Sequence, residues 1–206
     1  PNILFIYTDD QGAWTVGANG NPQAHTPNID RIFNEGANLR NSLVNSPVCS
    51  PARASLMTSR HGSELMITEW IHSRTTGLDP ALPTWPRILS KNGYRTGLIG
   101  KWHLGYPDKY FPTKLGYDYF MGMRAGGISA MNPKLEKDGK VQPFKGLTED
   151  IFTDEALAFI ERNKDRTFAL SVHYRAPHKA WLPVAKVDAA VHKDTDFTLP
   201  HPDLPD

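Results

Sequence analysis

Short, continuously apolar segments alternate with amphipathic ones along this chain, and this alternation restricts the possible folds more than any other feature. Residues 3–7, 94–99 and 167–174 are rich in β-branched and aromatic side chains, as is typical of strands buried on both faces of a parallel sheet. The sequence therefore predicts an α/β fold with a doubly wound, largely parallel sheet flanked by helices.

Helices and a further strand are expected between these segments, on the basis of proline and glycine positions and apolar spacing. The helices are expected over residues 27–35, 51–58 and 85–92 and from residue 153 onward, and the additional strand over residues 37–44. Residues 105–147 are rich in Gly, Pro, Lys and Tyr without a sustained period. We expect a loop-rich insertion there, with one hairpin.

The charge balance excludes some classes of protein. The chain has 23 Lys and Arg against 22 Asp and Glu, so it lacks the cationic excess of proteins that bind nucleic acids or anionic membranes. No apolar run approaches the roughly 18 residues of a membrane span. Cys49 is the single cysteine, so no internal disulfide can form.

Polar clusters follow three of the predicted strands, at the edge where open α/β sheets bind their ligands. They are Asp9-Asp10, Lys101 with His103, and His178. Adjacent carboxylates at the end of a buried strand favour a hard divalent cation, which makes Asp9 and Asp10 candidate metal ligands. The alternative is a solvated loop in which one of these aspartates caps the turn.

Cys49 directly precedes a predicted helix that begins at Ser50-Pro51. A residue at this place faces the free N–H groups of the first turn and the positive end of the helix dipole. Arg53 lies one turn along and points back to the same place, so the pair is suited to an anionic nucleophile or a bound oxyanion. The alternative is a small buried hydrophobic residue at a tight turn.

The residues around these clusters resemble the signatures of the type I, formylglycine-dependent sulfatases of the alkaline phosphatase superfamily. Residues 49–60, CSPARASLMTSR, resemble the signature in which Cys-x-Pro-x-Arg directs oxidation of the cysteine to Cα-formylglycine. Residues 100–105, GKWHLG, resemble the second signature. Residues 2–10 resemble the N-terminal metal-binding strand, and Ala176-Pro177-His178 resembles the later histidine motif. The four motifs occur in the family's order over nearly the whole chain.

The resemblance implies a sulfuric ester hydrolase that cleaves a sulfate ester, on a carbohydrate by family habit, to an alcohol and inorganic sulfate. Cys49 would be oxidised to formylglycine by a maturation enzyme, and the hydrated aldehyde would attack sulfur. Asp9 and Asp10, with the modified Cys49, would bind a divalent metal, most often calcium in this family.

The same resemblance implies roles for the other clustered residues. Arg53 would hold the aldehyde hydrate, and His103 would remove the proton of its second hydroxyl so that sulfate is expelled. Lys101 and His178 would neutralise sulfate oxygens, and His178 would also protonate the leaving alcohol. The residues after His178 depart from the commoner family pattern, and Ser59 stands where a glycine usually precedes Arg60.

Two alternatives to a working sulfatase stay open. Some members of the superfamily use the same nucleophile as phosphonate monoester or phosphodiester hydrolases. The family also completes its metal site and sulfate pocket from a segment beyond the histidine motif. Residues 1–206 are therefore expected to be the N-terminal part of the catalytic domain, without its C-terminal part and with weak metal binding of their own.

The family is commonly periplasmic or secreted, but no signal peptide is recognised in this chain, so its compartment is left open.

The remaining histidines and aromatic residues have less specific interpretations. His173 is expected to pack within its strand, and the other histidines outside the motifs, His25, His61, His72, His192 and His201, are expected at the surface. Aromatic residues gather near the motifs and offer either stacking surfaces for sugar rings or core packing; they are Trp14, Trp70, Trp102, Trp181, Tyr106 and Tyr110.

Overall fold

The computed structural model describes residues 1–72 and 74–198 and contains two compact units. The first unit comprises residues 1–9 and 44–182, and the second comprises residues 10–43 together with the described part of 183–206. Among the described residues, no helix is both long enough and apolar enough to cross a membrane.

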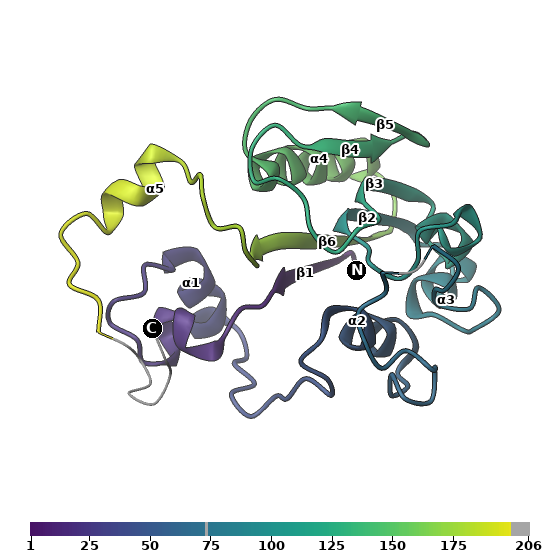
Figure 1. The fold of residues 1–206 in the computed structure, drawn as a ribbon, viewed down its shortest axis with the longest axis horizontal. Helices are drawn as coiled ribbons and strands as arrows, with labels where there is room; N and C mark the ends of the chain where they lie inside the picture. The colour runs from purple at the N-terminus through teal and green to yellow at the C-terminus, as the bar shows by residue number, and fades with distance from the viewer. Residues whose placement is uncertain (73, 199–206) are drawn as a thin grey trace. The chain divides into compact units, whose positions relative to one another are not determined.

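A six-stranded sheet forms the centre of the first unit (Figure 1), with the strand order β1-β6-β2-β3-β4-β5. Its strands are β1 (Ile3–Asp9), β2 (Arg95–Lys101), β3 (Tyr119–Met123), β4 (Lys134–Lys137), β5 (Lys140–Pro143) and β6 (Phe168–Pro177). The pairs β1–β6, β6–β2 and β2–β3 are parallel, whereas β4 and β5 are antiparallel to their neighbours. This mostly parallel sheet with flanking helices confirms the predicted α/β class.

Each face of the sheet has its own hydrophobic core. Adjacent residues of β2 point to opposite faces, so Leu98 belongs to one core and Ile99 to the other. On the Leu98 side lie α2 (Cys49–Thr58) and α3 (Trp85–Lys91), and on the Ile99 side lies α4 (Thr148–Asn163). Because both faces are covered, β2 is buried along almost its whole length.

Strand register places the candidate site residues at one edge of the sheet. Tyr7 of β1 and Gly100 of β2 both pair with His173 of β6, so the three strands end at nearly the same level. A Cβ on Gly100 would lie 1.9 Å from the carbonyl oxygen of His173, so only glycine allows the strands to approach this closely. Asp9 and Lys101 therefore lie at the same edge of the sheet, on strands that flank β6.

The expectation of a loop-rich insertion over residues 105–147 is wrong in one respect. The expected hairpin is present as β4 and β5, but β3 is an integral strand of the sheet, paired with β2 along its whole length. This five-residue run contains Gly122, which weakens its strand signal. Short 3₁₀ helices, Asp108–Tyr110 and Pro112–Lys114, precede it.

Three other expectations are corrected by the structure. Residues 37–44 form no strand, since their backbone has no paired neighbour and Leu39 and Leu43 are exposed. Helix α4 begins at Thr148, and the hydroxyl of Thr153 bonds the carbonyl of Glu149 within the helix instead of capping its start. Strand β1 is not buried on both faces, because Leu4 and Ile6 on one of its faces are about half exposed.

The second unit contains α1 (Pro27–Glu35), two 3₁₀ helices, Ala13–Thr15 and Gly17–Asn19, and α5 (Lys186–Val191), which was not expected from the sequence. Helix α1 begins and ends as predicted. Asp30 in its first turn accepts a hydrogen bond from the backbone N–H of Ala18 at 2.8 Å and one from the hydroxyl of Thr26 at 2.9 Å. These bonds fix the 3₁₀ segment against α1.

Candidate functional site

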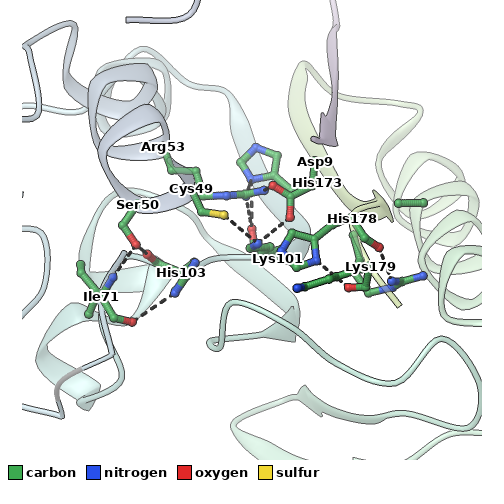
Figure 2. Close-up of polar contacts among 12 residues, drawn as sticks. Asp9, Cys49, Ser50, Arg53, Ile71, Lys101, His103, His173, His178 and Lys179 are labelled. Atoms are coloured by element: carbon green, nitrogen blue, oxygen red, sulfur yellow. Dashed lines mark hydrogen bonds and ion pairs between the residues drawn. The ribbon is translucent and has the colours of Figure 1, made fainter. Parts of the chain in front are cut away.

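A buried charge cluster lies where β1, β2 and the start of α2 meet (Figure 2). The Lys101 ammonium lies 2.5 Å from Oδ2 of Asp9 and 3.4 Å from the sulfur of Cys49. Nη2 of Arg53 lies 3.3 Å from Oδ1 of the same aspartate. Lys101, Arg53 and Asp9 are almost fully buried, and Cys49 is half-buried. The structure thus brings together four residues singled out from three separate sequence motifs.

The cluster has one more buried cation than anion, because Lys101 and Arg53 face the single carboxylate of Asp9. Burying a charge is costly unless it is paired and hydrogen-bonded. Nη1 of Arg53 donates to the carbonyl of Lys101 at 2.8 Å. Nη2 faces Asp9 as an ion pair, but neither Nη2 nor Nε makes a hydrogen bond among the described residues. Such donors suit an anion with several oxygens, of the kind that a sulfate group provides.

Two aromatic residues hold the Arg53 guanidinium in place. It lies 5.2 Å from the centre of the Tyr7 ring, and its Nη1 lies 3.3 Å from Nδ1 of His173. Burial of His173, and then the nearby Arg53, lower its pKa to about 3, so the ring is neutral at pH 7. In the tautomer that donates from Nδ1 to the Lys101 carbonyl, 3.2 Å away, the neutral ring adds no charge to the cluster, and it contacts Arg53 without accepting a hydrogen bond from it. Sequence reasoning placed His173 in strand packing and missed this contact.

His103 follows β2 in a left-handed backbone conformation, with a φ of 56°. Its ring is buried, and its Nε2 lies 3.1 Å from the carbonyl oxygen of Ile71. Burial, and then the Lys101 charge, lower its pKa to about 4. If Nε2 donates to Ile71, Nδ1 carries the free lone pair, and Nδ1 is buried without a hydrogen-bond partner in the described part of the chain. This is the state that a general base needs.

The hydroxyl of Ser50 joins the first turn of α2 to the His103 loop and to the segment around Ile71 (Figure 2). It donates to the carbonyl of His103 at 2.8 Å and accepts from the N–H of Ile71 at 2.9 Å. The sequence analysis assigned no role to Ser50. The available signal was a hydroxyl residue within the first turn of a helix, next to the candidate nucleophile.

A candidate metal-ligand group consists of Asp9, Cys49 and His178, whose ligand atoms all lie within 4.8 Å of one another. The sequence instead predicts Asp10 in this set and a different role for His178. Asp10 begins the second unit and is exposed, with a φ of 62°. The Asp9 carboxylate is one anionic ligand, but Arg53 and Lys101 already face its two oxygens. The group also offers fewer oxygens than the about six to eight that calcium prefers.

His178 lies in the loop after β6, and Arg175 shapes this loop. The Arg175 side chain is buried and donates to the carbonyls of His178 and Ala180, at 2.7 and 2.9 Å. Its guanidinium also pairs with Glu149 of α4 at 3.3 Å. Nδ1 of His178 lies 2.6 Å from the carbonyl of Lys179. The ring is thus held at the metal-ligand group by contacts that begin in α4.

The structure separates the aromatic residues near the motifs into two groups. Trp102 is fully buried in the core, where its indole donates to the carbonyl of Tyr110. Trp70 is 55% exposed, and its ring lies 6.4 Å from that of His103.

Among the other histidines, His25, His61 and His72 are exposed as expected and His192 is half-buried, whereas His201 lies outside the described residues.

A protein-family model described as Sulfatase matches residues 1–198. The chain is 34% identical over 204 residues to N-acetylglucosamine-6-O-sulfatase of Bacteroides thetaiotaomicron, covering 97% of this chain and 34% of that protein. It is 39% identical over 137 residues to human arylsulfatase D, covering 60% of this chain and 23% of that protein.

Solved structures show the same similarity. Ps i-CgsB superposes with a TM-score of 0.90 at 29% identity, over 96% of this chain and 49% of that one. BT4656 in complex with its substrate D-glucosamine-2-N,6-O-disulfate superposes with a TM-score of 0.82 at 32% identity, over 97% of this chain and 39% of that one. The chain therefore spans about a third or less of these two curated relatives and less than half of these structures.

Proposed function

Because this chain belongs to the sulfatase family, we propose that the protein carrying it hydrolyses a sulfate ester of a saccharide to an alcohol and inorganic sulfate. The observation that carries this proposal is the buried excess of positive charge around Asp9 and Cys49. Lys101 and Arg53 supply two cations against one carboxylate, and two nitrogens of Arg53 make no hydrogen bond among the described residues. A sulfate group would supply both the missing charge and the missing acceptors.

We propose that Cys49 is oxidised to formylglycine by a maturation enzyme of the host. The hydrated aldehyde would supply a hydroxyl that attacks sulfur and a second hydroxyl whose deprotonation expels sulfate. The position of Cys49 supports this role, because it is the first residue of α2 and lies 3.4 Å from the Lys101 ammonium. The N–H groups of that helix turn and the ammonium both favour oxyanions at this place.

The other residues of the cluster would bind the sulfate and move protons. Lys101 and Arg53 would neutralise the sulfate oxygens as negative charge builds up on them. His103 would accept a proton at Nδ1 while Nε2 keeps its bond to the Ile71 carbonyl. His178, held beside Cys49 by the loop after β6, would bind the sulfate and donate a proton to the departing alcohol oxygen.

We further propose that Asp9 and Asp10, with the modified Cys49, hold a divalent metal ion, and that this ion is calcium. When bound, the ion would stabilise negative charge on the sulfate and the nucleophile. The buried Asp9 carboxylate beside Cys49 supports this assignment. The additional oxygens that calcium prefers would come from elsewhere in the whole protein.

The saccharide substrate is proposed from the relatives. Two of the proteins similar to this chain are an N-acetylglucosamine-6-O-sulfatase and BT4656, which was solved with its substrate D-glucosamine-2-N,6-O-disulfate. A sulfated glucosamine is therefore the first substrate to test.

The test compares sulfate release from a sulfated glucosamine with hydrolysis of an aryl phosphodiester, using the whole protein matured in a host that makes formylglycine. We expect the sulfate ester to be preferred and Cys49→Ala to be inactive with an unchanged melting temperature. Intact mass reports the modification, since formylglycine is about 18 Da lighter than cysteine. A large preference for the phosphodiester, or turnover by Cys49→Ala, would contradict the proposal.

A further inference from the structure

A pocket of about 360 Å³ lies beside the His103 ring, and no side chain of its lining binds sulfate or moves a proton in the proposed chemistry. It is formed by residues 65–72 and 75–77 together with Tyr110, and we call it the Trp70 pocket. This volume falls in the range of small-ligand sites. Its lining mixes aromatic rings with hydroxyl and carboxylate groups; the polar and aromatic members are Glu69, Trp70, His72, Thr75, Thr76 and Tyr110.

Hydrogen bonds from the backbone of Ile71 to two side chains connect the pocket to His103 and Ser50. Ile71, the residue after Trp70, receives a bond from Nε2 of His103 at its carbonyl and donates its N–H to Ser50. Ile71 is buried, so these bonds are shielded from water. The neighbouring Trp70 ring is thereby held 6.4 Å from the His103 ring, at an interplanar angle of 45°. The wall of the pocket and the proposed base share one short stretch of backbone.

Trp70 presents an apolar surface to this pocket. Its side chain is 55% exposed, although a buried tryptophan would contribute substantially to stability. The His72 ring lies 5.0 Å from the Trp70 ring and extends the aromatic wall. Because Trp102, in the same unit, is fully buried, the exposure of Trp70 is not a general property of tryptophans in this fold.

The chemistry of the lining selects a type of ligand. A flat aromatic surface binds the apolar C–H face of a ring, and the threonine hydroxyls and Glu69 can exchange hydrogen bonds with hydroxyl groups at its rim. A second anion would be disfavoured beside Glu69, whereas the cations of the charge cluster bind the sulfate itself. A sugar ring combines an apolar face with a hydroxylated rim.

We propose that the Trp70 pocket is the subsite for the sugar ring that carries the scissile sulfate, with the ring lying against the Trp70 indole next to His103. This inference rests on the proposed sulfatase function, because the ester must enter the charge cluster while its ring occupies the pocket. Trp70 would then determine which sugar ring is bound. The backbone segment that positions the Trp70 indole would also position His103, the proposed base.

The test measures binding without turnover, in the whole protein carrying Cys49→Ala. Calorimetry gives the Kd of a sulfated glucosamine and of inorganic sulfate, with and without Trp70→Ala. We expect Trp70→Ala to raise the Kd of the sulfated glucosamine about tenfold and to leave the Kd of inorganic sulfate and the melting temperature unchanged. Trp70→Phe should recover most of the loss, and Leu157→Ala, which removes a 60% exposed apolar side chain from α4, should change neither Kd.

An unchanged Kd for the sulfated glucosamine in Trp70→Ala would overturn the subsite. An equal loss of affinity for both ligands, accompanied by a lower melting temperature, would also overturn it, because Trp70 would then act through packing. Turnover by the matured wild-type protein is measured separately. Binding that depends on Trp70 without any sulfate release would refute the proposed function and leave the subsite standing, so the two failures are distinguishable.

Discussion

The hydroxyl of Ser50, the neighbour of Cys49, donates a 2.8 Å hydrogen bond to the backbone carbonyl of His103. The same oxygen accepts a bond from the N–H of Ile71, whose carbonyl contacts the His103 ring. The proposed nucleophile and the proposed base, 54 positions apart in the sequence, are therefore held by one buried side chain.

Ser50→Ala is expected to lower kcat/KM about tenfold and to destabilise the protein by about 1–3 kcal/mol, since a buried carbonyl and a buried N–H lose their partner. Ser50→Thr keeps the hydroxyl and should lose less. Denaturant unfolding and steady-state kinetics measure the two effects. The formylglycine content of each variant must be determined by intact mass, so that poor maturation is not mistaken for poor positioning.

The pH profile separates positioning of His103 from general stability. Because burial and Lys101 lower its pKa to about 4, kcat/KM of the wild type should stay high down to about pH 4 as the pH falls. In Ser50→Ala the pH at which kcat/KM falls on the acid side should move toward 6.5, the ordinary pKa of histidine, as the His103 ring becomes more accessible to water. An identical acid limb in both proteins would argue against a positioning role for Ser50.

Lys101→Met should lower kcat/KM by about 10² to 10³, because it removes a buried cation from the proposed sulfate site but keeps most of the side-chain volume. The Kd of inorganic sulfate should rise in parallel. Lys91→Met, at the exposed end of α3, is the matched control and should leave both quantities unchanged. Wild-type affinity for sulfate in Lys101→Met would contradict the assignment.

Asp9→Asn should lower the melting temperature, because Lys101 and Arg53 would be left buried without their shared anion. Inorganic sulfate should then stabilise this variant more than it stabilises the wild type, by supplying the missing negative charge. Thermal unfolding in sodium sulfate and in sodium chloride of equal ionic strength tests this. The wild type controls for the general stabilising effect of sulfate, and equal gains in both proteins would refute the prediction.

His173 makes the stability of the fold depend on pH. Its folded pKa of about 3 lies below the ordinary value of 6.5, so between these limits the unfolded chain binds a proton that the folded chain does not. Stability should therefore fall as the pH drops from about 6.5 toward 3, by up to about 1.4 kcal/mol per pH unit for this residue.

His173→Asn retains a donor for the Lys101 carbonyl but cannot titrate. The slope of unfolding free energy against pH should be smaller in this variant over the same window, and denaturant titrations at several pH values measure it. Identical slopes in the two proteins would show that His173 is not the source of the pH dependence. His103, whose pKa is also lowered, should leave a residual slope between about pH 6.5 and 4 in both.

The sequence by itself determined the α/β class, the sulfatase family and the approximate positions of β1, β2 and β6, although each strand runs two or three residues past its predicted end. Local information suffices for these, because a buried strand needs a continuous apolar run and the motif residues follow such runs directly. It also identified Cys49, Arg53 and Lys101, which the fold brings to within contact distance of Asp9 or of one another.

The tertiary structure alone decided which surrounding side chains meet. Ser50 bonds Ile71 and the carbonyl of His103, and His173 contacts the carbonyl of Lys101; no local pattern predicts these contacts between distant segments. Strand β3 was missed because pairing with β2, and not its own five residues, makes it a strand. Trp70 and Trp102 carry the same side chain, but the packing around each leaves one exposed beside His103 and buries the other in the core, since burial depends on neighbours that the fold supplies.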